Sequence, residues 1–124
     1  WQKIQWRGID SSYRKAPWFE DYAPGVMELF QLKEKYLLDL NLKTIEWVMK
    51  KLKVNIDILA DNAVSETGKS EVVSKREDVR FGKYQQVFGD RYGFVPNLSI
   101  LDLLFCMGPA SKTYLEQSPS WENR

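Results

Sequence analysis

Apolar residues recur at helical spacing near the start of the chain. Trp6, Ile9 and Tyr13 lie three and four residues apart, which predicts a helix from about residue 4 to about residue 15. Pro17 follows, and a proline disfavours helical geometry in the residue before it. We therefore expect the first helix to end just before Pro17.

The next two segments also have helical patterns. Apolar residues continue over residues 18–32, where the Pro24-Gly25 pair predicts an interruption of the helix. Residues 35–53 give the clearest pattern, because five apolar residues share one face of an amphipathic helix: Leu38, Leu42, Ile45, Met49 and Leu52. Other apolar residues in the first half of this segment lie off that face, so we expect this half to pack between two neighbours.

Two segments have features of strands. In residues 54–58, β-branched residues alternate with Asn55 and Asp57, which predicts one buried strand after the long helix. Residues 81–88 contain aromatic side chains without a clean period, and we expect a short strand there. The glycine-rich segment 89–93 has the composition of a turn.

A compact helix is expected near the end of the chain. Asn97 is the expected N-cap, and Gly108-Pro109 is expected to end the helix. One side of this helix carries apolar residues: Leu98, Leu101, Leu104 and Phe105. A last short helix is predicted over about residues 109–117, because proline is well tolerated at the first helical position.

These elements predict a mainly helical α+β fold with four to five helices and one or two short strands, and we expect a fragment of an α/β domain. Residues 1–124 are expected to form one domain. The segment 61–80 is polar, mixed in charge and without a sustained period, so we expect a mobile loop. Residues 118–124 are expected to be a frayed tail.

Composition restricts the available chemistry. The chain has no histidine and one cysteine, which excludes Ser-His-Asp and Cys-His sites and leaves too few ligands for structural zinc. We therefore expect no metal site. Cys106 cannot form an internal disulfide, so we expect a cytoplasmic location and interpret Cys106 as a packed, inert thiol. The glycines do not form a phosphate-binding loop, and no cofactor is expected.

Charge and hydropathy exclude two classes of partner. Lys and Arg number 18 against 17 Asp and Glu, and this balance argues against nucleic-acid binding. The longest apolar stretch, residues 98–107, is shorter than the ~20 residues of a membrane helix and contains Asp102, so we expect no membrane span. The 14% aromatic content suits a protein core as well as a carbohydrate- or nucleobase-binding surface.

Several polar residues have both a structural and a functional interpretation. Asp102 lies between Leu98 and Phe105 on the helical wheel and should face the core, either as a proton acceptor or in a structural ion pair or hydrogen bond. Asn41 lies on the apolar face of the long helix, where its amide must bind protein or ligand. The cluster of Arg7, Asp10 and Arg14 is typical of a surface salt-bridge ladder, although it could form an anion site.

Two stretches together resemble the bacterial WbqC-like family, which is associated with O-antigen and other surface-polysaccharide gene clusters. The first contains the pattern I-x-x-x-Y-x-K-A-P-x-F-x-x-Y over residues 9–22 and continues in residues 40–47. The second contains residues 84–88 and the pattern F-V-P-N-L-S-I-x-D-x-L over residues 94–104. Family members begin with a further N-terminal segment, so we expect this chain to be a fragment, the larger C-terminal part of the family domain.

The resemblance implies membership of a poorly characterised family, with the role of a glycine, aminoacyl or related group transferase in O-antigen or other surface-polysaccharide biosynthesis as one hypothesis. The alternative is a non-catalytic module that binds a glycan or another partner during polysaccharide assembly. A nucleotide sugar, a glycan or an aminoacyl donor is the implied partner, and the oligomeric state stays open. The residues that match the family motifs are Arg7, Tyr13, Lys15, Asn41, Gln86, Asn97, Ser99 and Asp102.

The enzyme hypothesis gives roles to some of these residues. Asp102 would be the general base for an amine or a sugar hydroxyl. Asn41, Asn97 and Ser99 would orient the acceptor, while Arg7 or Lys15 would neutralise a phosphate or carboxylate on the donor. This hypothesis requires that Asp102 and Arg7 face one cleft.

Overall fold

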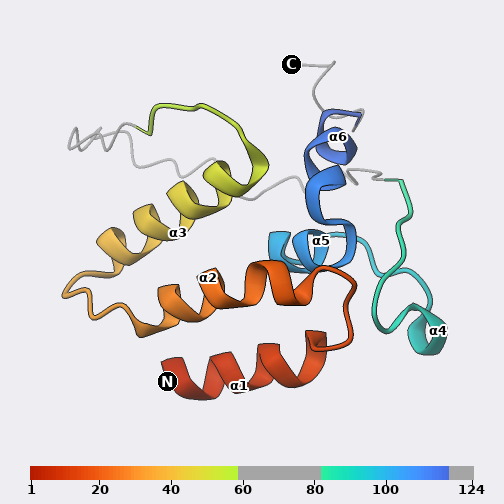
Figure 1. The fold of residues 1–124 in the computed structure, drawn as a ribbon, viewed down its shortest axis with the longest axis horizontal. Coiled ribbons are helices and arrows are strands. Elements are labelled where there is room, and N and C mark those ends of the chain that lie inside the picture. Colours follow the sequence, from red (N-terminus) through yellow and green to blue (C-terminus); the bar gives the residue numbers. More distant parts are fainter. Residues whose placement is uncertain (59–81, 118–124) are drawn as a thin grey trace, which may run out of the picture.

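The computed structural model describes residues 1–58 and 82–117, which form a mainly helical fold (Figure 1). In chain order the elements are α1 (Gln2–Tyr13), α2 (Phe19–Gln31), α3 (Leu37–Leu52), α4 (Gly89–Tyr92), α5 (Ile100–Met107), the 3-10 helix η1 (Gly108–Ala110) and α6 (Ser111–Glu116). The mainly helical prediction is confirmed. The expected loop at 61–80 and the expected tail at 118–124 lie outside the described residues.

Helix α2 is at the centre of the fold. It contacts α1, α3 and α5, and Figure 1 shows α1, α2 and α3 running back and forth. One face of α2 is buried against Leu104 and Phe105 of α5, both of which are fully buried. The α2 residues in this core are Phe19, Tyr22, Ala23 and Val26. Helix α5, which carries Asp102, is therefore fixed by the main core.

The predicted interruption of the second helix is wrong, because α2 continues through Pro24. Proline removes one backbone hydrogen bond, but Pro24 and the residue four positions before it, Glu20, are both exposed, so water can reach the unpaired carbonyl. Gly25 serves the packing of α2 against α3, since an added Cβ would lie 2.6 Å from Nε1 of Trp47. Burial of one helix face thus outweighs the local preference of the Pro-Gly pair.

Helix α3 confirms the long amphipathic helix, but its first half does not pack between two neighbours in the described part of the chain. Leu37 is 69% exposed and Leu38 is 60% exposed. Asn41 is also exposed, so the expectation of a buried amide at this position is wrong. Only the second half of α3 reaches the core, where Leu52 is buried.

The predicted short strands are absent from the described residues. Residues 54–58 and 82–86 have no regular secondary structure. A strand needs a neighbour to satisfy its backbone groups, and alternation alone does not provide one. In residues 54–58 the alternation also fails to predict burial, because Ile56 is 58% exposed.

The last helices agree with the prediction except at the start of α5. Ser99 is the N-cap, and its Oγ accepts a hydrogen bond from the backbone N–H of Leu101. Asn97 instead has a φ of 58°, a left-handed conformation that asparagine tolerates better than most residues. Leu98 therefore precedes the helix and is 44% exposed, so its predicted place on the apolar side is wrong.

No helix in the described ranges combines the length and the apolar character that crossing a membrane requires.

Candidate functional site

A buried carboxylate lies where three distant segments of the chain meet. Asp102 on α5 is 3% exposed, and the Tyr84 hydroxyl donates a hydrogen bond to its Oδ2. The Tyr13 hydroxyl, at the end of α1, also hydrogen-bonds with the Asp102 side chain. Among the described residues, no Lys or Arg pairs with Asp102. Its core-facing position agrees with the helical wheel, and its structural partners are tyrosines.

The surroundings of Asp102 keep the neighbouring groups protonated at neutral pH. Burial and the hydrogen bond to Asp102 raise the pKa of Tyr13 and of Tyr84 well above the usual value, so both phenols remain hydrogen-bond donors. Burial, with a smaller contribution from the nearby Asp102, raises the pKa of the Cys106 thiol to about 11. A protonated thiol is a poor nucleophile, which agrees with the interpretation of Cys106 as inert.

Asp102 and Tyr13 line a cavity of about 150 Å³, which we name the acidic cavity. Phe88, Tyr92 and Leu98 also line it. An ionised carboxylate can accept about four hydrogen bonds, and the two tyrosines use only part of this capacity. Asp102 can therefore accept a further hydrogen bond from a hydroxyl or ammonium group in the cavity.

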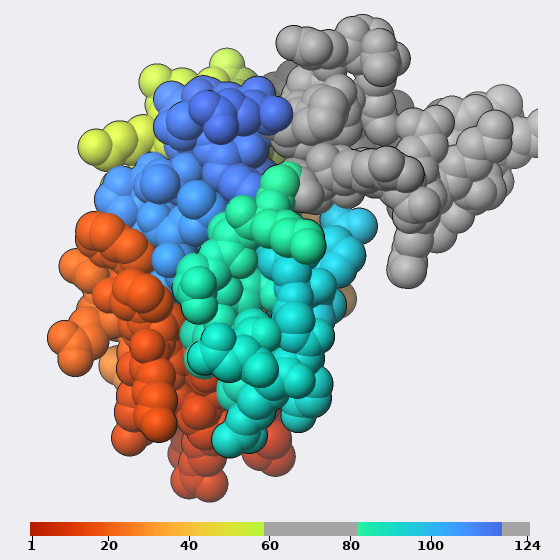
Figure 2. Space-filling view, turned by 90° about the vertical axis from the view of Figure 1, so that its right-hand side faces the viewer, coloured from red at the N-terminus to blue at the C-terminus, as the bar shows by residue number. Residues whose placement is uncertain are grey.

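A second cavity, of about 210 Å³, lies next to the first and is named here the aromatic cavity. The rings of Phe94 and Tyr114 both meet the Tyr84 ring edge-on, with centroid distances of 5.4 Å and 5.3 Å. Asn97 and Ser99 contribute polar groups to its lining. Figure 2 shows the face of the molecule where residues 82–100, in green to cyan, lie beside the N-terminal helices in red to orange.

Gln86 shapes the segment that lines these cavities. Its side chain is nearly buried and forms two hydrogen bonds with the backbone of Val95. Nε2 donates to the Val95 carbonyl at 2.8 Å, and Oε1 accepts from the Val95 N–H at 2.9 Å. The amide thus pairs with the Val95 backbone as a neighbouring strand would, and these bonds use one of its two N–H donors and one of the two acceptor positions of its oxygen.

Three residues that the motifs suggested lie away from both cavities. Arg7, Lys15 and Asn41 are exposed, and none of them lines the acidic or the aromatic cavity. The described structure therefore does not meet the requirement that Asp102 and Arg7 share a cleft. No Lys or Arg among the described residues lines either cavity, so the described lining provides no cation for a phosphate.

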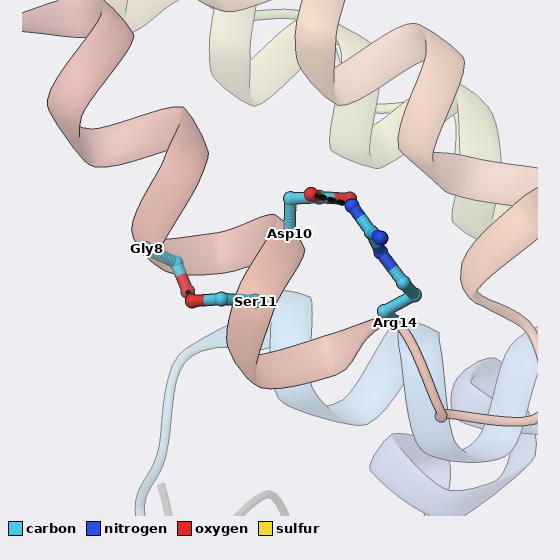
Figure 3. Close-up of polar contacts among 4 residues, drawn as sticks. All are labelled: Gly8, Asp10, Ser11 and Arg14. Carbon is cyan, nitrogen blue, oxygen red and sulfur yellow. Dashed lines mark hydrogen bonds and ion pairs between the residues drawn. The ribbon is translucent and has the colours of Figure 1, made fainter.

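The polar residues of α1 form a local network on its exposed surface. Figure 3 shows that the Arg14 guanidinium pairs with the carboxylate of Asp10, one helical turn earlier. The Ser11 hydroxyl donates to the Gly8 carbonyl at 3.0 Å. Such an exposed pair contributes little to stability. The salt-bridge interpretation of this cluster is confirmed for Asp10 and Arg14.

Sequence reasoning gave no site role to five aromatic residues that line the cavities: Tyr84, Phe88, Tyr92, Phe94 and Tyr114. All but Tyr114 lie in residues 81–94, where the aromatic content was the available signal, since the side chains there follow no helical or strand period. Their association with Asp102 depends on contacts between distant segments.

Comparison with known proteins supports one assignment. Neither a curated protein nor a solved structure matches the chain. The model of the WbqC-like protein family matches residues 1–79, which is more than half of the 124 residues. This match covers the N-terminal part of the chain and not residues 84–105, so the expected assignment to the C-terminal part of the family domain is corrected. The chain belongs to the WbqC-like protein family.

Proposed function

We propose that this chain binds a sugar or aminoacyl unit at Asp102, as part of a group transfer in the biosynthesis of O-antigen or another surface polysaccharide. The observation that carries the proposal is the buried Asp102 carboxylate, held by Tyr13 and Tyr84 in the wall of the acidic cavity. The pathway rests on the resemblance to the WbqC-like family.

The lining of the acidic cavity suits the acceptor of such a transfer. Sugar rings have apolar faces that pack on aromatic side chains and hydroxyl groups that donate to carboxylates. Phe88 and Tyr92 provide rings, and Asp102 provides the acceptor. A carboxylate without a neighbouring cation disfavours phosphate and favours hydroxyl or ammonium groups. We therefore assign the acceptor, rather than the charged part of the donor, to this cavity.

The chemical step that we propose keeps Asp102 as the base without Arg7, which lines neither cavity, and moves one proton to Asp102. The acceptor oxygen or nitrogen forms a bond with the acyl carbon of an aminoacyl donor, and the bond from that carbon to the leaving group breaks. The proton of the acceptor passes to the Asp102 carboxylate, which acts as the general base. Tyr13 and Tyr84 hold the carboxylate in place. Asn97 and Ser99 line the adjoining cavity, and we assign to them the orientation of the acceptor.

A second function is favoured by one observation. The Asp102 carboxylate already has two tyrosine partners, and the described cavities contain no cation for a donor phosphate. A module that binds a glycan without changing it needs only the acceptor site. This non-catalytic role is our alternative, and turnover separates it from the transferase.

Isothermal titration with sugars, nucleotide sugars and aminoacyl donors tests the binding step. Asp102→Asn keeps the side-chain shape but removes the charge, and we expect it to weaken binding by roughly 10- to 100-fold, the range for losing a charged hydrogen bond. Arg7→Gln is the control, because Arg7 lies outside both cavities. Equal affinities for wild type and a folded Asp102→Asn variant would contradict the proposal. Binding without turnover would support the non-catalytic alternative.

A further inference from the structure

We infer that the acidic and aromatic cavities are adjoining subsites for two linked sugar units, with Leu98 at the border between them. This inference rests on the proposed function and adds the size of the ligand. Leu98 lines both cavities and is 44% exposed. A ligand that fills both cavities must therefore pass over the Leu98 side chain.

Tyr84 connects the two cavities from the inside. Its ring lines the aromatic cavity, while its hydroxyl donates to Asp102 in the wall of the acidic cavity. The ring is held between the edges of Phe94 and Tyr114. One side chain thus contributes to the apolar wall of one cavity and holds the carboxylate in the wall of the other, which links the positions of the two subsites.

The sizes of the cavities favour one ligand over two separate ones. They measure about 150 Å³ and about 210 Å³. Pockets for small molecules usually have volumes of about 300–1,000 Å³. Each cavity alone falls below this range, and the two together reach it. A single sugar in one cavity would leave the other cavity, which shares Leu98 in its lining, unfilled.

The chemistry of the two linings assigns a different unit to each. The acidic cavity offers the carboxylate of Asp102, which accepts hydrogen bonds from a hydroxyl or amino group. The aromatic cavity offers rings together with the neutral Asn97 amide and Ser99 hydroxyl. This second lining suits an uncharged sugar ring packed on an aromatic face. The preferred ligand is therefore a neutral or amino-bearing disaccharide unit of a glycan.

Protein-observed NMR titration with matched sugars tests the inference and detects weak binding. The probes are glucose with maltose and cellobiose, and N-acetylglucosamine with its β-1,4-linked dimer. We expect at least one disaccharide to bind roughly tenfold more tightly than its monosaccharide, a factor typical of one additional well-packed group. Bound disaccharide should shift amide signals from both cavities, and bound monosaccharide should shift those of the acidic cavity alone.

Variants separate the two subsites. Phe94→Ala removes a ring of the aromatic cavity, and Leu98→Trp places bulk on the border. Phe94→Ala should reduce disaccharide affinity to about the monosaccharide level, roughly tenfold, and leave monosaccharide affinity unchanged. Leu98→Trp, at a residue that lines both cavities, should reduce the ratio of disaccharide to monosaccharide affinity to about one. Because Leu98 is largely exposed, its variant should fold even if Phe94→Ala does not. Leu38→Ala is the control, as an exposed leucine outside both cavities.

The outcomes distinguish this inference from the proposed function. Monosaccharide binding that depends on Asp102, without any gain for the disaccharides, would overturn the two-subsite inference alone. Disaccharide binding unchanged by a folded Leu98→Trp variant would also overturn it. Failure of every sugar probe to bind would overturn the two-subsite inference, and the proposed function would fall as well if nucleotide sugars and aminoacyl donors also failed to bind.

Discussion

Replacing Gly108 with alanine should destabilise the protein more than any ordinary surface change. Gly108 follows α5 and has a φ of 56° and a ψ of −128°, a backbone conformation that residues with a side chain rarely adopt. A Cβ at this position would lie 2.4 Å from Cδ2 of Trp18. The backbone N–H of Trp18 donates to the Phe105 carbonyl at 3.0 Å and ties this backbone to α5, so relief of the contact requires rotation of the Trp18 ring.

The expected loss of stability in Gly108→Ala is the sum of a backbone-strain cost and an overpacking cost. A strained backbone conformation costs about 1–3 kcal/mol. Overpacking a tight contact costs about 1–3 kcal/mol more. Their sum, roughly 2–6 kcal/mol, is a large part of the ~5–15 kcal/mol that stabilises a typical domain. At roughly 4 °C per kcal/mol or more, Gly108→Ala should lower Tm by at least about 8 °C.

Gly8→Ala is the matched control for this measurement. Gly8 lies within α1, has no positive φ, and an added Cβ there would meet nothing within 4 Å. Glycine inside a helix costs roughly 0.5–1 kcal/mol relative to alanine, so this variant should be more stable than wild type by that amount. Thermal and urea unfolding followed by circular dichroism measures both variants. A Gly108→Ala protein that unfolds at the wild-type temperature would refute the proposed rigidity of the Trp18 contact.

Two further predictions concern residues around the cavities. Gln86→Leu removes both hydrogen bonds to the Val95 backbone and should lower the free energy of unfolding, measured by urea titration, by about 1–3 kcal/mol. An unchanged midpoint of urea unfolding would show that these two bonds do not stabilise the fold. The rate at which iodoacetamide alkylates Cys106 should rise as the pH approaches 11, because the thiol pKa in the folded protein is about 11. A free thiol would show this rise near its ordinary pKa of 9.0. Because folding raises this pKa, the protonated thiol favours the folded state. This contribution to the free energy of unfolding is fully present below about pH 9 and is lost as the pH rises to about 11.

The helices could be predicted from sequence because their signals are local. The period of Trp6, Ile9 and Tyr13 locates α1, and the apolar face of residues 35–53 locates α3, each to within a few residues. The error at Pro24-Gly25 has a tertiary cause, since Gly25 allows Trp47 to approach α2. A local rule cannot include a partner that lies 22 positions away in the chain.

Burial on α3 could not be predicted from the helical face alone. Asn41 lies among apolar residues on the wheel, but exposure depends on whether another element covers that part of the helix. In the described chain, the first half of α3 remains exposed at Leu37 and Leu38. Asp102 differs because its helix is enclosed, with Leu103, Leu104 and Phe105 all buried. The same type of pattern therefore gave a correct position for Asp102 and an incorrect one for Asn41.

The motif around Pro96 combines residues that shape the backbone with residues that line the cavities. Gln86 fixes Val95, Asn97 adopts the left-handed conformation, and Ser99 caps α5. Together they define the path of the backbone up to the start of α5. That path places Leu98 between the two cavities. Polar residues that looked like ligand contacts from sequence thus have structural roles first, and an effect of Gln86 on binding would arise through the position of Leu98. Asp102 remains the motif residue whose carboxylate has capacity for a ligand, because its two partners leave acceptor positions unused.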